Sequence, residues 1–167
     1  MSHVEHKAQA PAAVACAVLT VSDSRTPDTD TSGRAIRQLL EEAGHVITDH
    51  AIVKDEPAQV ASYVRAQLAD ARTEVIITTG GTGITSRDGT FETIDGLLEK
   101  RLEGFGELFR MLSFQEIGAA AMLSRATAGT VARKAIFVLP GSEHASRLAM
   151  TRLILPELGH VVQQLGR

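Results

Sequence analysis

Three glycines directly after an apolar run are the residues best suited to bind an anion. The turn that follows residues 75–78 reads Thr79-Gly80-Gly81-Thr82-Gly83. Glycine adopts positive φ without strain, so successive N–H groups of such a turn can point at one phosphate while threonine hydroxyls add donors. The turn lacks the lysine of a P-loop, and its glycine spacing differs from the dinucleotide fingerprint. A tight turn without a ligand is the alternative interpretation.

Charged residues lie where they could share a ligand with this turn. Arg87 and Asp88 follow the glycines, and Asp23 and Asp55 each come just after another apolar run. Arg87 offers a cation for phosphate, whereas two carboxylates that share a phosphate suit Mg²⁺. A surface ion pair between Arg87 and Asp88 and a helix-capping role for Asp55 are the alternatives, because Pro57 begins a helical pattern.

Two further loops have the composition of a ligand-binding edge. Pro140, Gly141 and Ser142 end the last apolar run and precede a helical pattern. Free N–H groups and the helix dipole at that point could take a second phosphate or a carboxylate, although an ordinary turn explains the same residues. Ser22 and Asp23 end the first apolar run in a comparable way.

The elements that must position these loops alternate between strands and helices. Runs typical of buried strands lie at residues 14–21, 46–53, 75–79 and 135–139, and apolar residues at helical spacing follow each run. Parallel strands need the long crossovers that helices supply, so this order predicts an α/β fold with three α/β/α layers around a mostly parallel, doubly wound sheet. Ligands bind outside the carboxyl ends of the strands in such sheets, which places the loops on one edge.

The second half of the chain predicts two helices before the last strand. The first should carry apolar residues 91, 94, 97 and 98, and the second should begin after Gly104 and Gly106. In the second helix Leu108 should face the core, whereas Met111 and Phe114 fall partly off that stripe and should face outward as anchors of an interface.

Composition narrows the function classes. The chain has 167 residues, 44% of them hydrophobic and only 4% aromatic, with a formal net charge of −3. We expect one domain at residues 13–167 after a flexible tail at residues 1–12, no nucleic-acid partner, and no membrane span. The tail carries His3 and His6, which we expect to be exposed to solvent and not to bind a metal. Cys16 is the only cysteine and should be a buried small side chain, which fits a reducing cytoplasm.

Several short motifs together resemble the molybdopterin-binding family, which includes molybdopterin adenylyltransferases and the B proteins of molybdenum-cofactor biosynthesis. The resemblance covers residues 14–158, and the stretch 104–118 is more similar to the B branch. The motifs that carry it are Thr78-Thr79-Gly80-Gly81-Thr82-Gly83, Ser86-Arg87-Asp88, Gly104-Phe105-Gly106-Glu107, Ser124-Arg125 and Leu139-Pro140-Gly141-Ser142.

The resemblance implies a ligand, a reaction and an assembly. The ligand is molybdopterin, whose terminal phosphate would attack the α-phosphate of ATP with Mg²⁺ present, and no permanently bound cofactor is expected. Asp55 and Asp88 would be the catalytic residues and would lie at the metal. The remaining site residues would bind phosphate or line the pocket: Ser22, Asp23, Thr79, Gly80, Gly81, Thr82, Gly83, Arg87, Ser124, Arg125, Pro140, Gly141 and Ser142. Family members form trimers or hexamers, so a homo-oligomer is expected.

Two other functions stay open on the sequence. Residues 114–117 and the loop 25–31 depart from the adenylyltransferase pattern, so the chain could bind or deliver the pterin without chemistry. A generic nucleotide-binding α/β domain is the more distant alternative.

Overall fold

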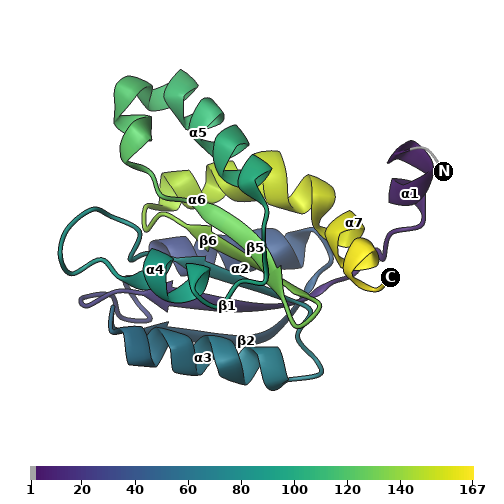
Figure 1. Cartoon of the computed structure of the whole chain (residues 1–167), viewed down its shortest axis with the longest axis horizontal. Coiled ribbons are helices and arrows are strands. Elements are labelled where there is room, and N and C mark those ends of the chain that lie inside the picture. The colour runs from purple at the N-terminus through teal and green to yellow at the C-terminus, as the bar shows by residue number, and fades with distance from the viewer. Residues whose placement is uncertain (1–2) are drawn as a thin grey trace.

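A six-stranded sheet with the strand order β2-β1-β3-β6-β5-β4 forms the centre of the molecule (Figure 1). The computed structural model describes residues 3–167. Strands β2, β1, β3 and β6 run parallel, and β5 runs antiparallel to both of its neighbours. The expected mostly parallel sheet is confirmed. The strands are β1 Ala15–Val21, β2 Val46–Val53, β3 Val75–Thr79, β4 Lys100–Arg101, β5 Thr127–Val131 and β6 Lys134–Leu139.

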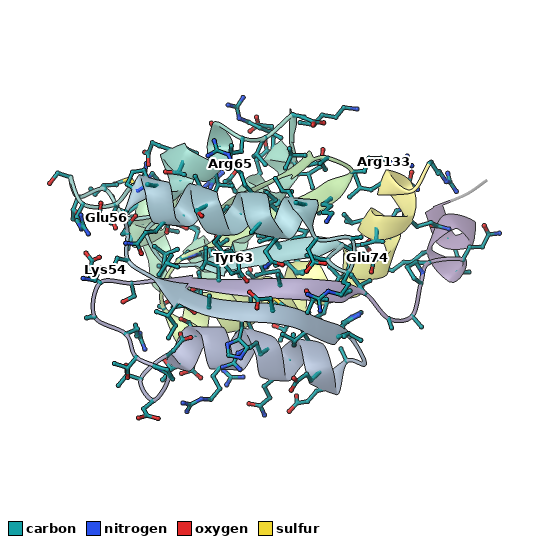
Figure 2. The ribbon with its side chains drawn as sticks, turned by 90° about the horizontal axis from the view of Figure 1, so that it is seen from below. Lys54, Glu56, Tyr63, Arg65, Glu74 and Arg133 are labelled. Atoms are coloured by element: carbon teal, nitrogen blue, oxygen red, sulfur yellow. The ribbon has the colours of Figure 1, made fainter. Side chains whose placement is uncertain are left out.

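Helices cover both faces of this sheet, which makes three layers. Alternate residues of β1 belong to opposite cores: Val18 packs with α2, α5, α6 and α7, whereas Leu19 packs with α3 and α4. Figure 2 shows α3 lying over one face with Tyr63 directed at the sheet. The helices are α1 His3–Ala8, α2 Thr31–Glu42, α3 Pro57–Ala69, α4 Thr90–Asp95, α5 Glu103–Ile117, α6 Glu143–Ala149 and α7 Leu155–Leu165.

The four parallel strands end level with one another. Val21 of β1 pairs with Val53 of β2, Thr20 pairs with Thr79 of β3, and Thr79 pairs with Leu139 of β6. The chain crosses from β2 over β1 to β3, so the order of the strands reverses beside β1. A crevice at such a reversal is where open α/β sheets bind ligands.

The largest departure from the sequence-based expectation is α5. It begins at Glu103, so Gly104 and Gly106 lie inside the helix rather than before it. A Cβ at position 106 would come within 2.4 Å of Arg110 Nη2 and 2.9 Å of the Ala126 carbonyl oxygen, so glycine is needed for close packing and not for a turn. Leu108, expected in the core, is 48% exposed. Among the described residues α4 ends at Asp95, short of the expected length.

Helices α1 and α7 lie together, away from the carboxyl edge of the sheet (Figure 1). Residues 3–8, which we expected to lie in a tail outside the fold, form α1, and Lys7 Nζ lies 2.5 Å from Glu157 Oε1 of α7. A π-helical segment, Met150–Ile154, joins α6 to α7 just before Pro156, whose missing N–H cannot continue an α-helical ladder. No helix within residues 3–167 combines the length and the apolarity needed to cross a membrane.

Candidate functional site

The loops at the carboxyl ends of β1, β2, β3 and β6 meet at one edge of the sheet, as the sequence predicts. Ser22 N donates to Val53 O at 2.9 Å, and Gly80 N donates to Leu139 O at 3.0 Å. A Cβ on Gly141 would lie 3.3 Å from Gly80 Cα, so two of the loops touch through their backbones. Figure 2 shows Lys54 and Glu56 at this end of the sheet and Glu74 and Arg133 at the other.

The glycine turn depends on glycine for two different reasons. Gly80 and Gly81 have φ of +99° and +70°, which glycine adopts without strain. Close contacts also exclude a side chain, because a Cβ on Gly81 would lie 2.0 Å from Thr90 Oγ1. Gly83 has no positive φ, contrary to the expectation for all three glycines. A Cβ there would instead lie 2.5 Å from Asp88 Oδ2.

The turn presents backbone donors, as an anion site requires. Within residues 3–167 the amide N–H groups of Gly81, Thr82, Gly83 and Ile84 have no hydrogen-bond partner. Thr82 is buried, whereas Gly83 and Ile84 are exposed. Unpaired N–H groups are costly to bury and attract anions where solvent can reach them.

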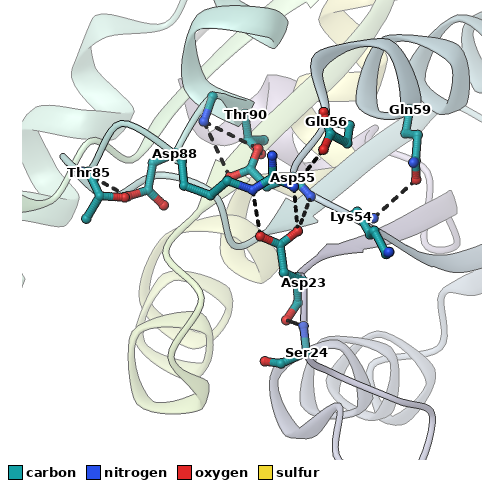
Figure 3. A network of polar contacts seen from close by, with 12 residues as sticks. Asp23, Ser24, Lys54, Asp55, Glu56, Gln59, Thr85, Asp88 and Thr90 are labelled. Atoms are coloured by element: carbon teal, nitrogen blue, oxygen red, sulfur yellow. Dashed lines mark hydrogen bonds and ion pairs between the residues drawn. The ribbon is translucent and has the colours of Figure 1, made fainter.

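Asp55 is the buried carboxylate of the site. The residue is only 6% exposed, and its side chain accepts hydrogen bonds from Gly89 N at 3.3 Å and from Thr90 Oγ1 at 3.3 Å (Figure 3). Burial raises the pKa of Asp55 above its usual range, and the nearby carboxylates of Asp88 and Asp23 raise it further. Long hydrogen bonds and crowding by like charge leave this carboxylate able to gain from a cation. The helix-capping role that the sequence allowed for Asp55 is not found, because the start of α3 has no side-chain cap.

Arg87 is held between two carboxylates. Its Nε lies 2.7 Å from Asp23 Oδ2, and its Nη2 lies 2.7 Å from Glu56 Oε1. Figure 3 shows Asp23 also accepting from the backbone N–H of Asp55. These contacts, with that of Arg87 first, lower the pKa of Asp23 to about 2. Arg87 therefore joins the loops after β1, β2 and β3, through partners other than the Asp88 that the sequence suggested.

Asp88 lies beside the glycine turn in the same loop. Its Oδ2 accepts from Thr85 N at 3.0 Å and from Thr85 Oγ1 at 2.6 Å, and the side chain is partly exposed. Its charge acts on Asp55, although no direct hydrogen bond joins the two carboxylates. The described residues contain no group of three or more His, Cys, Asp and Glu side chains placed to hold a metal. A pair of carboxylates that shares a cation with phosphate is the arrangement that Mg²⁺ accepts.

The other expected site residues serve mainly to hold the loops. Thr79 Oγ1 donates to Pro140 O at 2.8 Å, and Ser142 caps α6 by accepting from Ala145 N. Ser22 Oγ accepts from Arg25 N at 3.0 Å, which shapes the loop after β1. Arg125 Nε donates to Thr82 O at 3.0 Å, so this arginine contacts the carbonyl side of the glycine turn.

Ser124 differs from these residues. Its hydroxyl is buried and has no hydrogen-bond partner in the described part of the chain. It lines a separate polar pocket of ≈ 420 Å³ together with Arg101, Arg110 and Arg125. The structure therefore does not bring Ser124 into the carboxylate cluster around Asp55.

A cleft of ≈ 530 Å³ opens beside Asp23, between the loop after β1 and strand β2. Arg37, His50 and Lys54 line it, and within residues 3–167 none of their side chains has a hydrogen-bond or ion-pair partner. Sequence reasoning missed Arg37 and His50 because they lie inside a helix and a strand. It also missed Thr90, which follows Gly89 at the start of α4 and contacts Asp55.

Comparisons with known proteins show the family and the fold. A family model described as a probable molybdopterin binding domain matches residues 17–160. The Bacillus cereus molybdenum cofactor biosynthesis protein B is 52% identical over 168 residues, which cover 100% of this chain and 99% of the Bacillus protein. A crystal structure of a molybdenum cofactor biosynthesis protein B matches with a TM-score of 0.92 at 52% identity, covering 95% of this chain and 99% of that one. The tungsten cofactor synthesizing protein MoaB from Pyrococcus furiosus matches with a TM-score of 0.84 at 35% identity, covering 95% and 100%.

Proposed function

We propose, since this chain belongs to the molybdenum cofactor biosynthesis protein B family of molybdopterin-binding domains, that it binds molybdopterin and joins the terminal phosphate of that pterin to AMP from ATP. Membership of the family makes the chain a component of molybdenum-cofactor biosynthesis. The adenylyl transfer is our proposal. We also propose a cytoplasmic location, which the use of ATP as the second substrate favours.

The observation that carries the proposal is that backbone N–H groups and carboxylates lie around the same turn. Residues 81–84 offer four N–H groups that have no partner in the described part of the chain, and Asp55 and Asp88 lie against the same turn. The N–H groups suit phosphate oxygens, and the carboxylates suit a cation bound to those oxygens. A site for an uncharged ligand would need neither.

The reaction needs no nucleophile from the protein. An oxygen of the terminal phosphate of the pterin attacks the α-phosphorus of ATP, a new P–O–P bond forms, and the bond from the α-phosphorus to the bridging oxygen breaks. Pyrophosphate leaves with the electron pair of that bond. The protein contributes position and charge: the N–H groups hold phosphate in line, and fixed dipoles stabilise the charge that develops.

Asp55 and Asp88 are the residues that would hold Mg²⁺. The raised pKa of Asp55 fits this role: burial raises it most, the charges of Asp88 and Asp23 add to it, and a bound cation would offset both effects. A bound Mg²⁺ supplies neutralisation of phosphate charge. The cleft lined by Arg37, His50 and Lys54 has room for the body of a substrate beyond its phosphates, because small-molecule pockets measure roughly 300–1,000 Å³.

We propose in addition that the chain forms a homo-oligomer, a trimer or a hexamer. Figure 1 shows α5 and the 3-10 helix Gly118–Leu123 projecting beyond the sheet. Met111, Phe114 and Met122 on this projection are 51%, 61% and 79% exposed. Large apolar side chains that are exposed on one projection favour a protein contact, and symmetric self-association is its usual form.

Release of pyrophosphate from Mg-ATP, measured with and without molybdopterin, tests the proposed reaction. Release that depends on molybdopterin supports adenylyl transfer. Binding of molybdopterin in calorimetry with no pyrophosphate released would show a protein that binds or delivers the pterin without chemistry. Binding of Mg-ATP with no affinity for molybdopterin would show a generic nucleotide-binding domain.

A further inference from the structure

Arg125 approaches the glycine turn from the side of its carbonyl groups. Its Nε donates to Thr82 O at 3.0 Å, and its Nη2 donates to Gly83 O. Its third nitrogen, Nη1, pairs with Glu92 of α4. Every nitrogen of the Arg125 guanidinium therefore already has a partner within the protein.

Carbonyl contacts fix the orientation of three successive peptide groups. In a trans peptide the C=O of one residue and the N–H of the next point in opposite directions. Gly81 O accepts from Thr90 N at 3.1 Å, and Arg125 binds the next two carbonyls, those of Thr82 and Gly83. The N–H group of Thr82 must then point away from Thr90, and those of Gly83 and Ile84 must point away from the Arg125 guanidinium. These are three of the four N–H groups that have no partner within residues 3–167.

Arg125 is itself held in place. Its guanidinium carbon lies 5.1 Å from the centre of the Phe91 ring, and its side chain is 26% exposed. The contact with Arg125 lowers the pKa of Glu92, so this carboxylate stays charged at neutral pH. A planar fork with five donors can bind two carbonyls and a carboxylate in one fixed geometry, which an ammonium group cannot match.

We propose that Arg125 is a positioning residue, which orients the N–H groups of residues 82–84 toward a phosphate, and that it does not contact the phosphate itself. The inference rests on the proposed function, because it assumes that phosphate binds at this turn. It assigns Arg125 a different role from that of a cation in the pocket wall.

The first part of the test uses the ligand-free protein. Arg125→Gln and Arg125→Lys are compared with Arg101→Gln, a matched control: Arg101 lines the same polar pocket but pairs with Asp95 and contacts no carbonyl of the turn. We expect both Arg125 variants to shift the ¹⁵N–¹H resonances of Thr82, Gly83 and Ile84 and to speed their hydrogen exchange. Arg101→Gln should leave these resonances unchanged. Unchanged resonances in Arg125→Lys, which keeps the charge beside Glu92, would overturn the proposal.

The second part titrates each protein with inorganic pyrophosphate and follows the same resonances. In the wild type pyrophosphate should shift these three amides. Both Arg125 variants should bind at least about tenfold more weakly, which corresponds to about 1.4 kcal/mol. Wild-type affinity in Arg125→Lys would mean that the charge of Arg125, and not its geometry, serves the anion, and would also overturn the proposal.

The two parts separate this inference from the proposed function. If the wild-type amides do not respond to pyrophosphate or to Mg-ATP, phosphate does not bind at the turn and the proposed reaction is wrong. The ligand-free spectra still decide whether Arg125 orients the peptide groups. Thermal unfolding of each variant identifies a general loss of folding, which would move resonances throughout the sheet and not only in the turn.

Discussion

Replacing Gly81 with alanine would place a methyl group inside the contact between Thr90 and Asp55. The added Cβ would lie 2.0 Å from Thr90 Oγ1 and 2.7 Å from Asp55 Oδ2, both far inside van der Waals contact. Thr90 is fully buried and Asp55 is 6% exposed, so neither side chain can move into solvent without disturbing its neighbours. The substitution therefore acts on the carboxylate and on the turn at once.

The expected cost has two parts. A φ of +70° is a left-handed conformation that costs a residue with a Cβ roughly 1–2 kcal/mol. Moving Thr90 from Asp55 breaks a hydrogen bond to a charged group, which is worth about 1.5–3 kcal/mol. We expect Gly81→Ala to lower the free energy of unfolding by about 3 kcal/mol and to reduce pyrophosphate release by about 10²-fold, the scale seen when a preorganised electrostatic group is lost.

Gly44→Ala is the matched control. Gly44 ends α2 with φ of +86°, and a Cβ there would meet nothing within 4 Å. It shares the backbone strain of Gly81→Ala but lacks the clash and lies outside the site. We expect it to cost about 1–2 kcal/mol and to leave pyrophosphate release within twofold of the wild type.

Urea unfolding and the pyrophosphate assay on both variants test this prediction. The difference between the two variants measures the displaced contact alone, because the backbone term cancels. Equal losses of stability in both variants would refute the steric reasoning at Gly81. Full activity in Gly81→Ala would remove the contact between Asp55 and Thr90 from the catalytic site.

Three more outcomes follow from the site and the projecting helix. Asp88→Asn should reduce pyrophosphate release by about 10²-fold with unchanged thermal unfolding, because asparagine can still accept from Thr85 while it loses the charge; turnover within a fewfold of the wild type would exclude Asp88 from the site. The raised pKa of Asp55 means that the folded state holds the proton of this carboxyl more tightly than the unfolded state does. The contribution of Asp55 to stability therefore falls as the pH rises from 3.8, the ordinary pKa of the group, through its raised pKa in the folded state. The stability of Asp55→Asn relative to the wild type should therefore be greater at pH 7 than at pH 4. A difference in urea unfolding that does not change with pH would contradict the raised pKa of Asp55. Light scattering should give the wild type a mass of at least three chains of 17.8 kDa and Phe114→Ser a lower mass, whereas a monomeric wild type at high concentration would contradict the proposed interface.

Three of the four parallel strands, β1, β3 and β6, could be predicted because their sequences are apolar on both faces. Residues 15–21 of β1 and 75–79 of β3 are almost entirely buried, and such runs have few alternatives in a chain of this size. Their carboxyl ends then fixed the edge at which the site forms. Cys16 is buried in β1, as expected, and burial raises the pKa of its thiol to about 12.

The strands at the antiparallel edge of the sheet have no comparable apolar pattern in their sequence. β4 has two residues, both exposed, and the hairpin from β5 to β6 turns through Ala132 and Arg133. These residues have φ of +51° and +61°, a conformation that usually selects asparagine or glycine. Tertiary contacts hold a turn here that local preferences do not predict.

Site residues near the glycine turn could be identified, but their partners could not. The sequence places Arg87 next to Asp88, yet its carboxylate partners, Asp23 and Glu56, are 64 and 31 positions away in the chain. For Arg125 the sequence cannot tell which side of the turn the side chain approaches. That choice depends on α4, which supplies Glu92 and Phe91.

The charges of the site make its backbone donors decisive. Asp23, Asp55, Glu56 and Asp88 outnumber Arg87, which Asp23 and Glu56 already engage. A phosphate that approaches the turn therefore meets repulsion from carboxylates, and among residues 3–167 no arginine without a partner lies at the turn to compensate for it. Attraction at the turn itself then depends on N–H groups that are already oriented and on a cation that arrives with the phosphate, whereas Arg37 and Lys54 lie in the cleft beside Asp23. This explains why the glycines, whose substitution would displace Thr90 or Asp88, matter as much to the site as the carboxylates themselves.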